Sequence, residues 1–313
     1  MWARLPAGAR EALAGLPATD LQTLLLSLAR TRSARVRPAD LVRRWREDRF
    51  VRPAASDPRT LVALENRMWR LLPAAVQGVE LSPVVPLGTC TAVGPVSQNR
   101  MVTTMRSAEV VSDSTNALAI EAAARRLRQP TTGVVHLAAS HRQLRAQQFG
   151  AGMSAHFRLF ALVSSARDVG SGATQARLLL LHLGYWQEVL ATLLPPASAR
   201  LHYTVFGRSA VGERMIDTVL PNLTTGPVPV VAEPERERGR GYYTDIALRI
   251  TAGEGTDVVE LGDGGFTTWT GQLMGNAKER CLVSCLATER LATLAADMRH
   301  LKVDHDVSRA ETR

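Results

Sequence analysis

The spacing of apolar residues along the chain alternates between a helical period and a strand period, which predicts a mixture of helices and strands. In residues 59–75 the apolar side chains lie at positions 61, 64, 68, 71 and 72, which is one face of an amphipathic helix. Residues 176–196 predict a longer, largely apolar helix that ends at two prolines. Both helices are expected to pack against a core.

The first part of the chain has a different pattern. Residues 1–57 are predicted to form a helical, basic N-terminal extension, and residues 58–313 to form the main folded core. Within the extension, Thr19 and Asp20 are predicted to cap a leucine-rich helix, and Pro38 to lie in the first turn of the next helix. A turn-rich, proline-containing stretch separates the extension from the core.

The remaining periodic segments predict the other elements of the core. Expected strands cover residues 79–85, 109–113 and 202–208, a strand–loop–strand hairpin covers 133–165, and expected helices cover 116–128 and 212–220. Two further strands flank a turn at 253–257, a glycine turn is expected at 262–265, and a last strand at 281–286 leads into a helix.

Composition places the chain among ordinary globular proteins. It has 313 residues, of which 45% are hydrophobic and 21% charged. The net charge of +9 is uneven, because residues 1–60 contain twelve arginines and only six acidic residues. Such a basic segment can bind nucleic acid or an acidic partner, and it can equally be a solvated helix face.

The cysteines and the apolar runs restrict the environment. Cys90, Cys281 and Cys285 are an odd number without metal-type spacing, so buried free thiols and a cytoplasmic location are expected. The chain has no run of 18 apolar residues and no N-terminal targeting pattern. No membrane association is expected.

Residues 236–291 contain the most distinctive combination of side chains. Arginines precede the pair Tyr242 and Tyr243, a glycine-rich segment follows, and a strand ends at Glu289 and Arg290. Guanidinium groups stack on aromatic rings and bind phosphate oxygens, while glycine allows close backbone approach. This combination favours binding of a planar, phosphorylated ligand.

Three segments of this region resemble class II aminoacyl-tRNA synthetases, most closely the catalytic core of histidyl-tRNA synthetase. RGRGYYTD at 238–245 resembles the signature Arg-Gly-Leu-Asp-Tyr-Tyr-Thr-Gly, and Gly264-Gly265 resembles the start of Gly-Gly-Arg-Tyr-Asp-Gly-Leu. LVSCLATERL at 282–291 resembles motif 3. The resemblance covers roughly residues 59–295 and implies an α+β fold, a mainly antiparallel sheet flanked by helices. The helix, Gly78 and the strand after it resemble motif 1, which implies a homodimer.

The resemblance also implies residues that bind an amino acid or small carboxylate substrate. Asp113 and Thr115 match the segment that holds the substrate's α-amino group, although Ser and Asp before a helix are also typical N-caps. Tyr242 and Tyr243 would line the side-chain pocket or pack as strand aromatics. The full implied substrate-binding set is Asp113, Thr115, Tyr242, Tyr243, Gly264 and Gly265.

ATP binding is implied by motifs 2 and 3. Carried over, Arg145 grips the α-phosphate and Phe157 stacks on adenine, while Arg142, three residues earlier, is the competing candidate for the motif 2 arginine. Arg290, preceded by Glu289, would stack on adenine and reach the γ-phosphate.

Three arginines are therefore the implied catalytic residues: Arg145, Arg238 and Arg290. The resemblance gives Arg238 the task of polarising the substrate carboxylate and the α-phosphate. Glu260 and Asp263 lie where an acidic residue could hold Mg²⁺, and each could instead be a turn or strand-end residue. ATP and Mg²⁺ are the expected cofactors.

Several positions depart from the family pattern. Gln147 replaces the motif 2 acid, Ala287 replaces the motif 3 glycine, and Gly241 replaces the aspartate of the tyrosine signature. Because a pocket that loses its buried polar groups loses the ligand that they recognise, histidine is not the expected substrate. The chain ends about twenty residues after motif 3, so we expect no anticodon-binding domain.

The sequence favours ATP-dependent adenylation of an amino acid or related carboxylate, with transfer to an acceptor other than normally charged tRNA. The three retained arginines support an enzyme. Loss of the motif 2 acid supports the alternative, a non-catalytic paralogue that acts as a ligand-sensing regulatory subunit. A third alternative is an RNA-binding accessory protein, with tRNA or another RNA held by the basic N-terminal segment.

Overall fold

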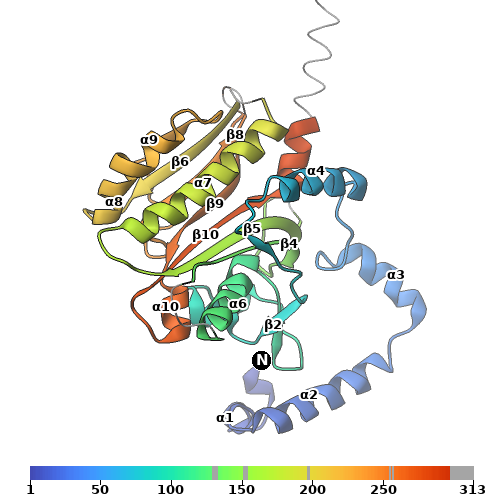
Figure 1. Ribbon diagram of the computed structural model, residues 1–313. Coiled ribbons are helices and arrows are strands. Elements are labelled where there is room, and N and C mark those ends of the chain that lie inside the picture. Colours follow the sequence, from blue (N-terminus) through green and yellow to red (C-terminus); the bar gives the residue numbers. More distant parts are fainter. Residues whose placement is uncertain (129–132, 151–153, 196–197, 254, 256, 297–313) are drawn as a thin grey trace, which may run out of the picture.

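The computed structural model describes residues 1–128, 133–150, 154–195, 198–253, 255 and 257–296. An eight-stranded sheet, in the order β1-β4-β5-β10-β9-β8-β6-β7, forms the centre of the molecule, with helices on both of its faces (Figure 1). The pairs β1–β4 and β6–β7 are parallel and the other five pairs are antiparallel. The predicted α+β class and mainly antiparallel sheet are confirmed.

The strands of the large sheet are β1 (Gln77–Gly78), β4 (Val135–Leu144), β5 (His156–Arg167), β6 (Ala199–Val205), β7 (Val230–Ala232), β8 (Thr244–Ala252), β9 (Val259–Thr267) and β10 (Glu279–Ala287). A small second sheet pairs β2 (Val84–Pro86) with β3 (Ala108–Val110). The predicted hairpin over 133–165 is confirmed as β4 and β5, and part of its loop, 151–153, lies outside the described residues.

The α-helices are α1 (Ala9–Ala14), α2 (Ala18–Ser33), α3 (Pro38–Glu47), α4 (Pro58–Arg70), α5 (Thr89–Val93), α6 (Ser114–Arg128), α7 (Ala173–Leu193), α8 (Ala210–Arg214), α9 (Leu220–Leu223) and α10 (Trp269–Met274). A further helix covers residues 288–296, as the motif 3 pattern predicts. Shorter turns are η1 (Trp2–Arg4), η2 (Gln98–Arg100) and the π-helical turn η4 (Met215–Val219).

Two hydrophobic cores lie on opposite faces of the sheet because side chains alternate along each strand. Phe160 and Leu162 of β5 belong to the core under α4 and α7, which continues to α8, η4 and α9. Ala161 and Val163 of the same strand belong to the second core, under α6 and α10. Helix α4 begins at Pro58, where the side chain of Asp57 caps the amide of Arg59.

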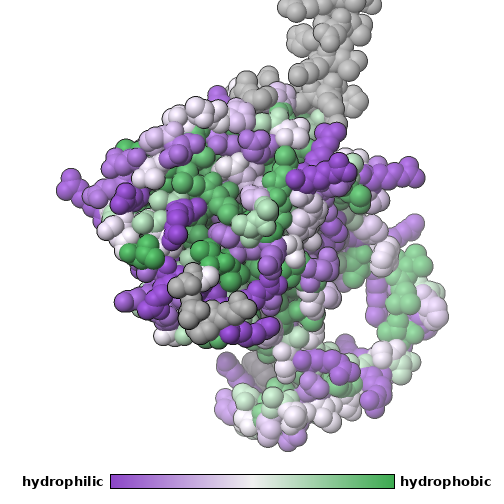
Figure 2. All heavy atoms as spheres, viewed as in Figure 1, coloured by the Kyte–Doolittle hydropathy of each residue, from purple (hydrophilic) through white to green (hydrophobic). Residues whose placement is uncertain are grey.

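Helices α1, α2 and α3 form an arm that leads away from the sheet and returns to it before α4 (Figure 1). None of their side chains is buried. Large apolar side chains remain exposed on this arm, including Leu28, Leu41 and Trp45, and green patches are visible along it in Figure 2. The apolar side chains of these three helices therefore do not form a hydrophobic core within this chain.

The predicted start of the leucine-rich helix, at Leu21 after a Thr19–Asp20 cap, is three residues too late. Helix α2 begins at Ala18, with Pro17 at its N-cap and no side-chain cap. Thr19 and Asp20 therefore lie inside the first turn. The prediction for Pro38 is confirmed, because this residue begins α3.

The predicted glycine turn at 262–265 is also wrong, because these residues lie within β9. A methyl group on Gly262 would overlap the carbonyl of Cys285, and one on Gly264 would lie 2.8 Å from Cα of Ser284. The glycines permit close approach of β9 to β10 rather than chain reversal. Reversal occurs earlier, between β8 and β9, at the predicted 253–257 turn, where 254 and 256 lie outside the described residues.

Three other predicted elements differ in extent. The strand expected at 79–85 is reduced to β2, and the strand expected at 109–113 ends at Val110, because the residues after it lead into α6. The helix expected at 212–220 is divided into α8, η4 and α9. No helix within the described ranges combines the length and the apolar character needed to cross a membrane.

Candidate ligand site

Asp113 immediately precedes α6 and caps its first turn. Its Oδ1 accepts hydrogen bonds from the backbone amide of Thr115 at 2.9 Å and from the hydroxyl of Thr115 at 2.7 Å. Its Oδ2 lies 3.4 Å from Nη2 of Arg145. Capping therefore uses one carboxylate oxygen and leaves the other directed at an arginine from a different segment. The predicted cap is confirmed, and the substrate role of Asp113 and Thr115 stays a prediction.

Arg145 follows the end of β4 and connects Asp113 to the β4–β5 hairpin. Its Nε donates to the carbonyl of Ser112 at 2.8 Å, and its guanidinium carbon lies 5.1 Å from the ring centroid of Phe157. The Phe157 ring also makes an edge contact with Phe149, with centroids 6.0 Å apart. The hairpin thus brings together a carboxylate, a guanidinium and an aromatic face, the groups that the resemblance assigns to ammonium, phosphate and adenine.

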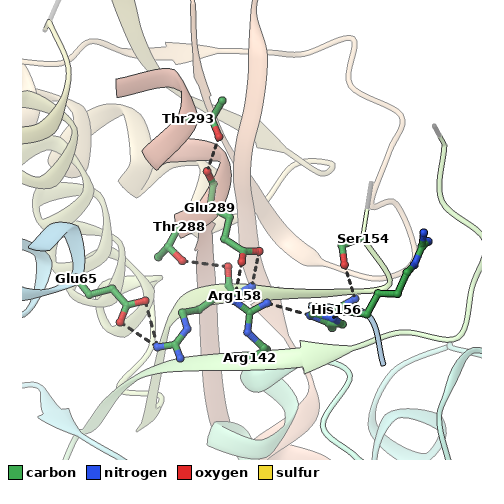
Figure 3. A network of polar contacts seen from close by, with 9 residues as sticks. Glu65, Arg142, Ser154, His156, Arg158, Thr288, Glu289 and Thr293 are labelled. Atoms are coloured by element: carbon green, nitrogen blue, oxygen red, sulfur yellow. Dashed lines mark hydrogen bonds and ion pairs between the residues drawn. The ribbon is translucent and has the colours of Figure 1, made fainter. Parts of the chain in front are cut away.

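The competing arginine, Arg142, has different partners. Its Nη2 lies 2.6 Å from Oε1 of Glu289, at the start of the last helix, and its Nη1 contacts the His156 ring at 3.0 Å. The second oxygen of Glu289 accepts from the backbone amide of Arg158, whose side chain pairs with Glu65 (Figure 3). Arg142 therefore belongs to a network that ties β4, β5 and α4 to the end of β10.

The other two implied catalytic arginines meet at Glu260, near the start of β9. Nη1 of Arg238 lies 3.1 Å from the Glu260 carboxylate, and Nη1 of Arg290 donates to the Glu260 backbone carbonyl at 2.9 Å. The side chain of Arg238 is 76% exposed. Its ion pair is therefore largely hydrated, and Arg238 can exchange this partner for a ligand at little cost.

The two tyrosines of the signature are packed inside the protein, beside acidic groups. The ring centroids of Tyr242 and Tyr243 are 4.9 Å apart, and that of Tyr242 is 5.7 Å from Trp269. Burial raises the pKa of both tyrosines, and the negative charges of Asp113 and Asp263 raise it further. Three segments far apart in sequence therefore place Asp113, Asp263 and the tyrosines in one neighbourhood.

The two predicted magnesium ligands do not fit the ion well. Burial raises the pKa of Asp263, Asp113 and Glu260 add to the rise, and Arg236 and Arg238 oppose it, so this carboxyl is harder to ionise than an exposed one. Glu260 pairs with the exposed Arg238 side chain, which competes with a metal ion for this carboxylate. Because Mg²⁺ binds ionised carboxylates, burial also makes Asp263 a poor ligand for it.

The glycines of the implied substrate set have roles within the protein. A methyl group on Gly265, where φ is +154°, would lie 2.7 Å from the ring of Tyr243 and 2.7 Å from the carbonyl of Ile246. Gly264 allows the approach of β10 described above. These two residues shape the packing of the tyrosine signature, and their contact with a substrate stays a prediction.

Sequence reasoning missed Gln143, a fully buried residue of β4. Its Oε1 accepts from the backbone amide of Ser114 at 2.9 Å, and its Nε2 has no hydrogen-bond partner in the described part of the chain. A glutamine at an inward position of a buried strand indicates a polar contact, because buried amides need hydrogen-bond partners. This pattern could have identified Gln143 from the sequence.

No protein-family model matches the sequence, and no curated protein matches it. The solved structures do match, and they show that the chain has the catalytic fold of class II aminoacyl-tRNA synthetases. Apo histidyl-tRNA synthetase of S. aureus has a TM-score of 0.60 and 15% identity, covering 79% of this chain and 68% of that one.

Two further structures have the same fold. A Bacillus halodurans protein described as an ATP phosphoribosyltransferase regulatory subunit/histidyl-tRNA synthetase has a TM-score of 0.60 and 11% identity, over 79% of this chain and 82% of that one. Histidyl-tRNA synthetase of Nostoc sp. PCC 7120 has a TM-score of 0.57 and 14% identity, over 82% and 75%. Similarity at these identities establishes the fold. The activity has to be inferred from the residues of the site.

Proposed function

We propose that the protein activates an amino acid or a related carboxylate by adenylation with ATP. One observation carries the proposal: Asp113 and Arg145, which lie 3.4 Å apart, form adjacent binding groups for a cation and for a phosphate, with the Phe157 ring beneath the arginine. Adenylation needs these groups side by side, because the ammonium-bearing substrate and the α-phosphate must meet in line.

In the proposed reaction a substrate carboxylate oxygen attacks the α-phosphorus of ATP. A new O–P bond forms, the bond from the α-phosphorus to the bridging oxygen breaks, and pyrophosphate leaves. Arg145 stabilises the charge that develops on the α-phosphate, and Arg238 is sufficiently exposed to leave Glu260 and orient the carboxylate. Phe157 and Arg290 hold the adenine and the phosphate tail.

The substrate's ammonium group is assigned to Asp113. The charge of Asp113 adds to the raised pKa of Asp263 and of Tyr242, and the nearby arginines oppose it, so a bound ammonium group would offset the same carboxylate charge. Gln143, with its unpartnered amide nitrogen beside the cap of α6, is a further group for orienting the substrate. Dimerisation through α4, and transfer of the acyl group to an acceptor other than normally charged tRNA, belong to the same proposal.

A ligand-sensing regulatory subunit is the second candidate. The raised pKa of Asp263 favours it, because this carboxyl is then a poor ligand for a catalytic metal ion. Gln147, in place of the motif 2 acid, acts in the same direction. A sensor needs the Asp113–Arg145 site but does not need to release pyrophosphate.

ATP–pyrophosphate exchange tests the proposal. Purified full-length protein with Mg²⁺ is screened against pools of amino acids and small carboxylates, and ATP binding is measured by calorimetry. The matched variants are Arg145→Ala and Arg208→Ala, the second at an exposed site in another part of the molecule. Exchange with one pool that Arg145→Ala abolishes and Arg208→Ala retains supports adenylation. ATP binding without exchange in any pool favours the sensor, and the lack of both contradicts both candidates.

A further inference from the structure

A hollow opens at one end of the large sheet. It has a volume of about 700 Å³ and lies where β8 and β10 begin and β9 ends, between these strands, α10 and the first turn of α7. Residues that line it include Gln175, Asp245, Phe266, Gln272, Ala277 and Arg280. A cavity of this size can hold a small molecule.

This hollow is separate from the candidate ligand site. Strand β9 runs from Glu260, near the arginine-rich end, to Thr267, which lines the hollow. Seven residues of extended chain at roughly 3.4 Å each span about 24 Å. A ligand in the hollow would therefore not reach Arg290, which bonds the Glu260 carbonyl.

Gln175 supplies a buried polar group without a partner. The residue is 4% exposed, and its Oε1 has no hydrogen-bond partner in the part of the chain that the structure describes. A buried acceptor in this state lowers stability unless a donor reaches it. This oxygen is closed off from solvent, so it meets a donor group on a ligand when the Gln175 side chain, which lines the hollow, turns toward it.

Asp245 supplies a second acceptor. Its backbone has φ of +51°, an uncommon conformation for a residue other than glycine, and it lies where the pairing of β8 with β9 shifts register between Thr244 and Ala247. Within the described ranges its carboxylate makes no hydrogen bond or ion pair. Burial raises the pKa of this carboxyl and the charge of Asp168 adds to the rise, while the Arg280 guanidinium opposes it without forming an ion pair with Asp245. Strained backbone of this kind is concentrated at functional sites.

The other charged groups that line the hollow are already engaged. The Glu279 carboxylate receives two hydrogen bonds from Arg126. The Arg280 guanidinium pairs with Asp168 at 2.6 Å and donates to the carbonyl of Ala277. Of the charges around the hollow, the one on Asp245 is therefore the one available to a ligand.

From these contacts we propose that the hollow binds a small organic cation, a primary ammonium or guanidinium group on an apolar body. The cationic head donates to the Asp245 carboxylate and to Oε1 of Gln175. The apolar body lies against Phe266, Ala277 and the glycines of α10. This site is independent of the adenylation proposal, because it uses none of the residues assigned to ATP or to the substrate carboxylate.

Calorimetric titration of the full-length protein tests the proposal, with benzylamine and agmatine as cationic probes and benzyl alcohol as the neutral analogue of the first. At least one of the two cations should bind. If benzylamine binds, benzyl alcohol should bind at least tenfold more weakly. Asp245→Asn should weaken the binding tenfold or more, because it removes the charge while asparagine still adopts the left-handed backbone. Asp217→Asn, at an exposed position in η4, should change affinity less than twofold.

Gln175→Met provides a second variant, because it keeps the side-chain length and removes the acceptor oxygen. It should weaken binding about threefold to tenfold, and circular dichroism verifies that each variant is folded. The proposal is overturned if neither cation binds, if benzyl alcohol matches benzylamine, or if folded Asp245→Asn and Gln175→Met both bind the cation as tightly as the natural chain does.

Discussion

Arg126 and Glu279 form a bidentate ion pair inside the protein, between α6 and the first residue of β10. Nε and Nη2 of the arginine lie 2.6 and 3.0 Å from the two carboxylate oxygens, and each side chain is 2% exposed. Nη1 donates to the carbonyl of Gly133. Two residues separated by 153 positions are thereby fixed to each other, at the wall of the hollow that Gln175 and Asp245 line.

Removing one member of this pair should be strongly destabilising. Arg126→Met leaves the Glu279 carboxylate buried and uncompensated, which costs about 3–5 kcal/mol of the free energy of unfolding. Arg43→Met, which breaks the exposed pair with Glu47, is the control and should leave the urea midpoint unchanged within error. Equal midpoints for the two variants would show that the buried pair adds nothing.

The close approach of β9 and β10 predicts the effect of adding one methyl group. Gly264→Ala should lower stability by about 1–3 kcal/mol, because the new Cβ would lie 2.8 Å from Cα of Ser284 and force the strands apart. Gly184→Ala in α7 is the matched control. Its Cβ would meet nothing within 4 Å, so it should stabilise the helix by up to about 1 kcal/mol. Thermal denaturation of both variants gives the comparison.

His182 predicts a loss of stability in acid. The ring is fully buried, with Nε2 2.8 Å from the Ser164 hydroxyl and Nδ1 2.8 Å from the Ser284 hydroxyl. Burial lowers its pKa from 6.5 to about 3. Between these values the unfolded chain binds a proton that the folded chain excludes, so the free energy of unfolding should fall as pH decreases from 6.5 toward 3.

The variant His182→Gln isolates this contribution. It should be less stable than the natural chain at pH 7, because the hydrogen bonds with both serines are altered. The number of protons taken up on unfolding in acid should fall by up to one, so the free energy of unfolding should depend less steeply on pH. The other partly buried histidines, His136, His141 and His202, retain their own contributions. Denaturant unfolding at several pH values measures the slope, and an unchanged slope would mean that His182 is already protonated in the folded state.

The two candidate arginines of motif 2 should have separable effects. Arg145→Ala should weaken ATP binding tenfold or more, because the phosphate-binding guanidinium above Phe157 is lost. Arg142→Ala should mainly lower stability, because Glu289 loses its ion pair within a partly buried network. Calorimetry with ATP and thermal unfolding of the same two proteins distinguish the roles. The opposite pattern would transfer the phosphate role to Arg142.

Deletion of residues 1–50 should leave the core folded. Helices α1 to α3 bury no side chain, and Arg49, which bonds the carbonyls of Ala146 and Gln147, is a rare direct link between the deleted segment and the core. The melting temperature should change by no more than about 4 °C, which corresponds to roughly 1 kcal/mol or less in a domain of this size. Sedimentation should give the same oligomeric state if α4 forms the dimer contact. Conversion of a dimer to a monomer would assign the contact to the arm.

The sequence predicts helices, strands and caps that depend on neighbouring residues. It does not predict contacts between residues that lie far apart in the sequence. Helix α7 and the β4–β5 hairpin follow from apolar periodicity, and the cap by Asp113 follows from residue type and position. By contrast, the glycines of β9 predict a turn from local propensity, and only the proximity of β10 explains them. The burial of Arg126 is not predictable in the same way. The basic last turn of α6 has the composition of a solvent-exposed surface, and only the pairing with Glu279 explains why Arg126 is buried.

The candidate site shows the same division. The separation between Arg145 and Phe157 predicts their meeting, since a hairpin returns the chain on itself. The pairing of Arg238 with Glu260 and the buried environment of Asp263 depend on neighbouring strands, and residue order does not reveal them. Gln143 could have been identified from the sequence, because it is a polar residue in a strand whose neighbouring positions are buried.

Strands β8, β9 and β10 extend from Glu260 and Arg290 at one end of the sheet to the hollow at the other. By thermodynamic linkage, the factor by which a cation in the hollow changes the affinity for ATP must equal the factor by which ATP changes the affinity for the cation. A single titration of either ligand in the presence of the other would therefore report the coupling in both directions.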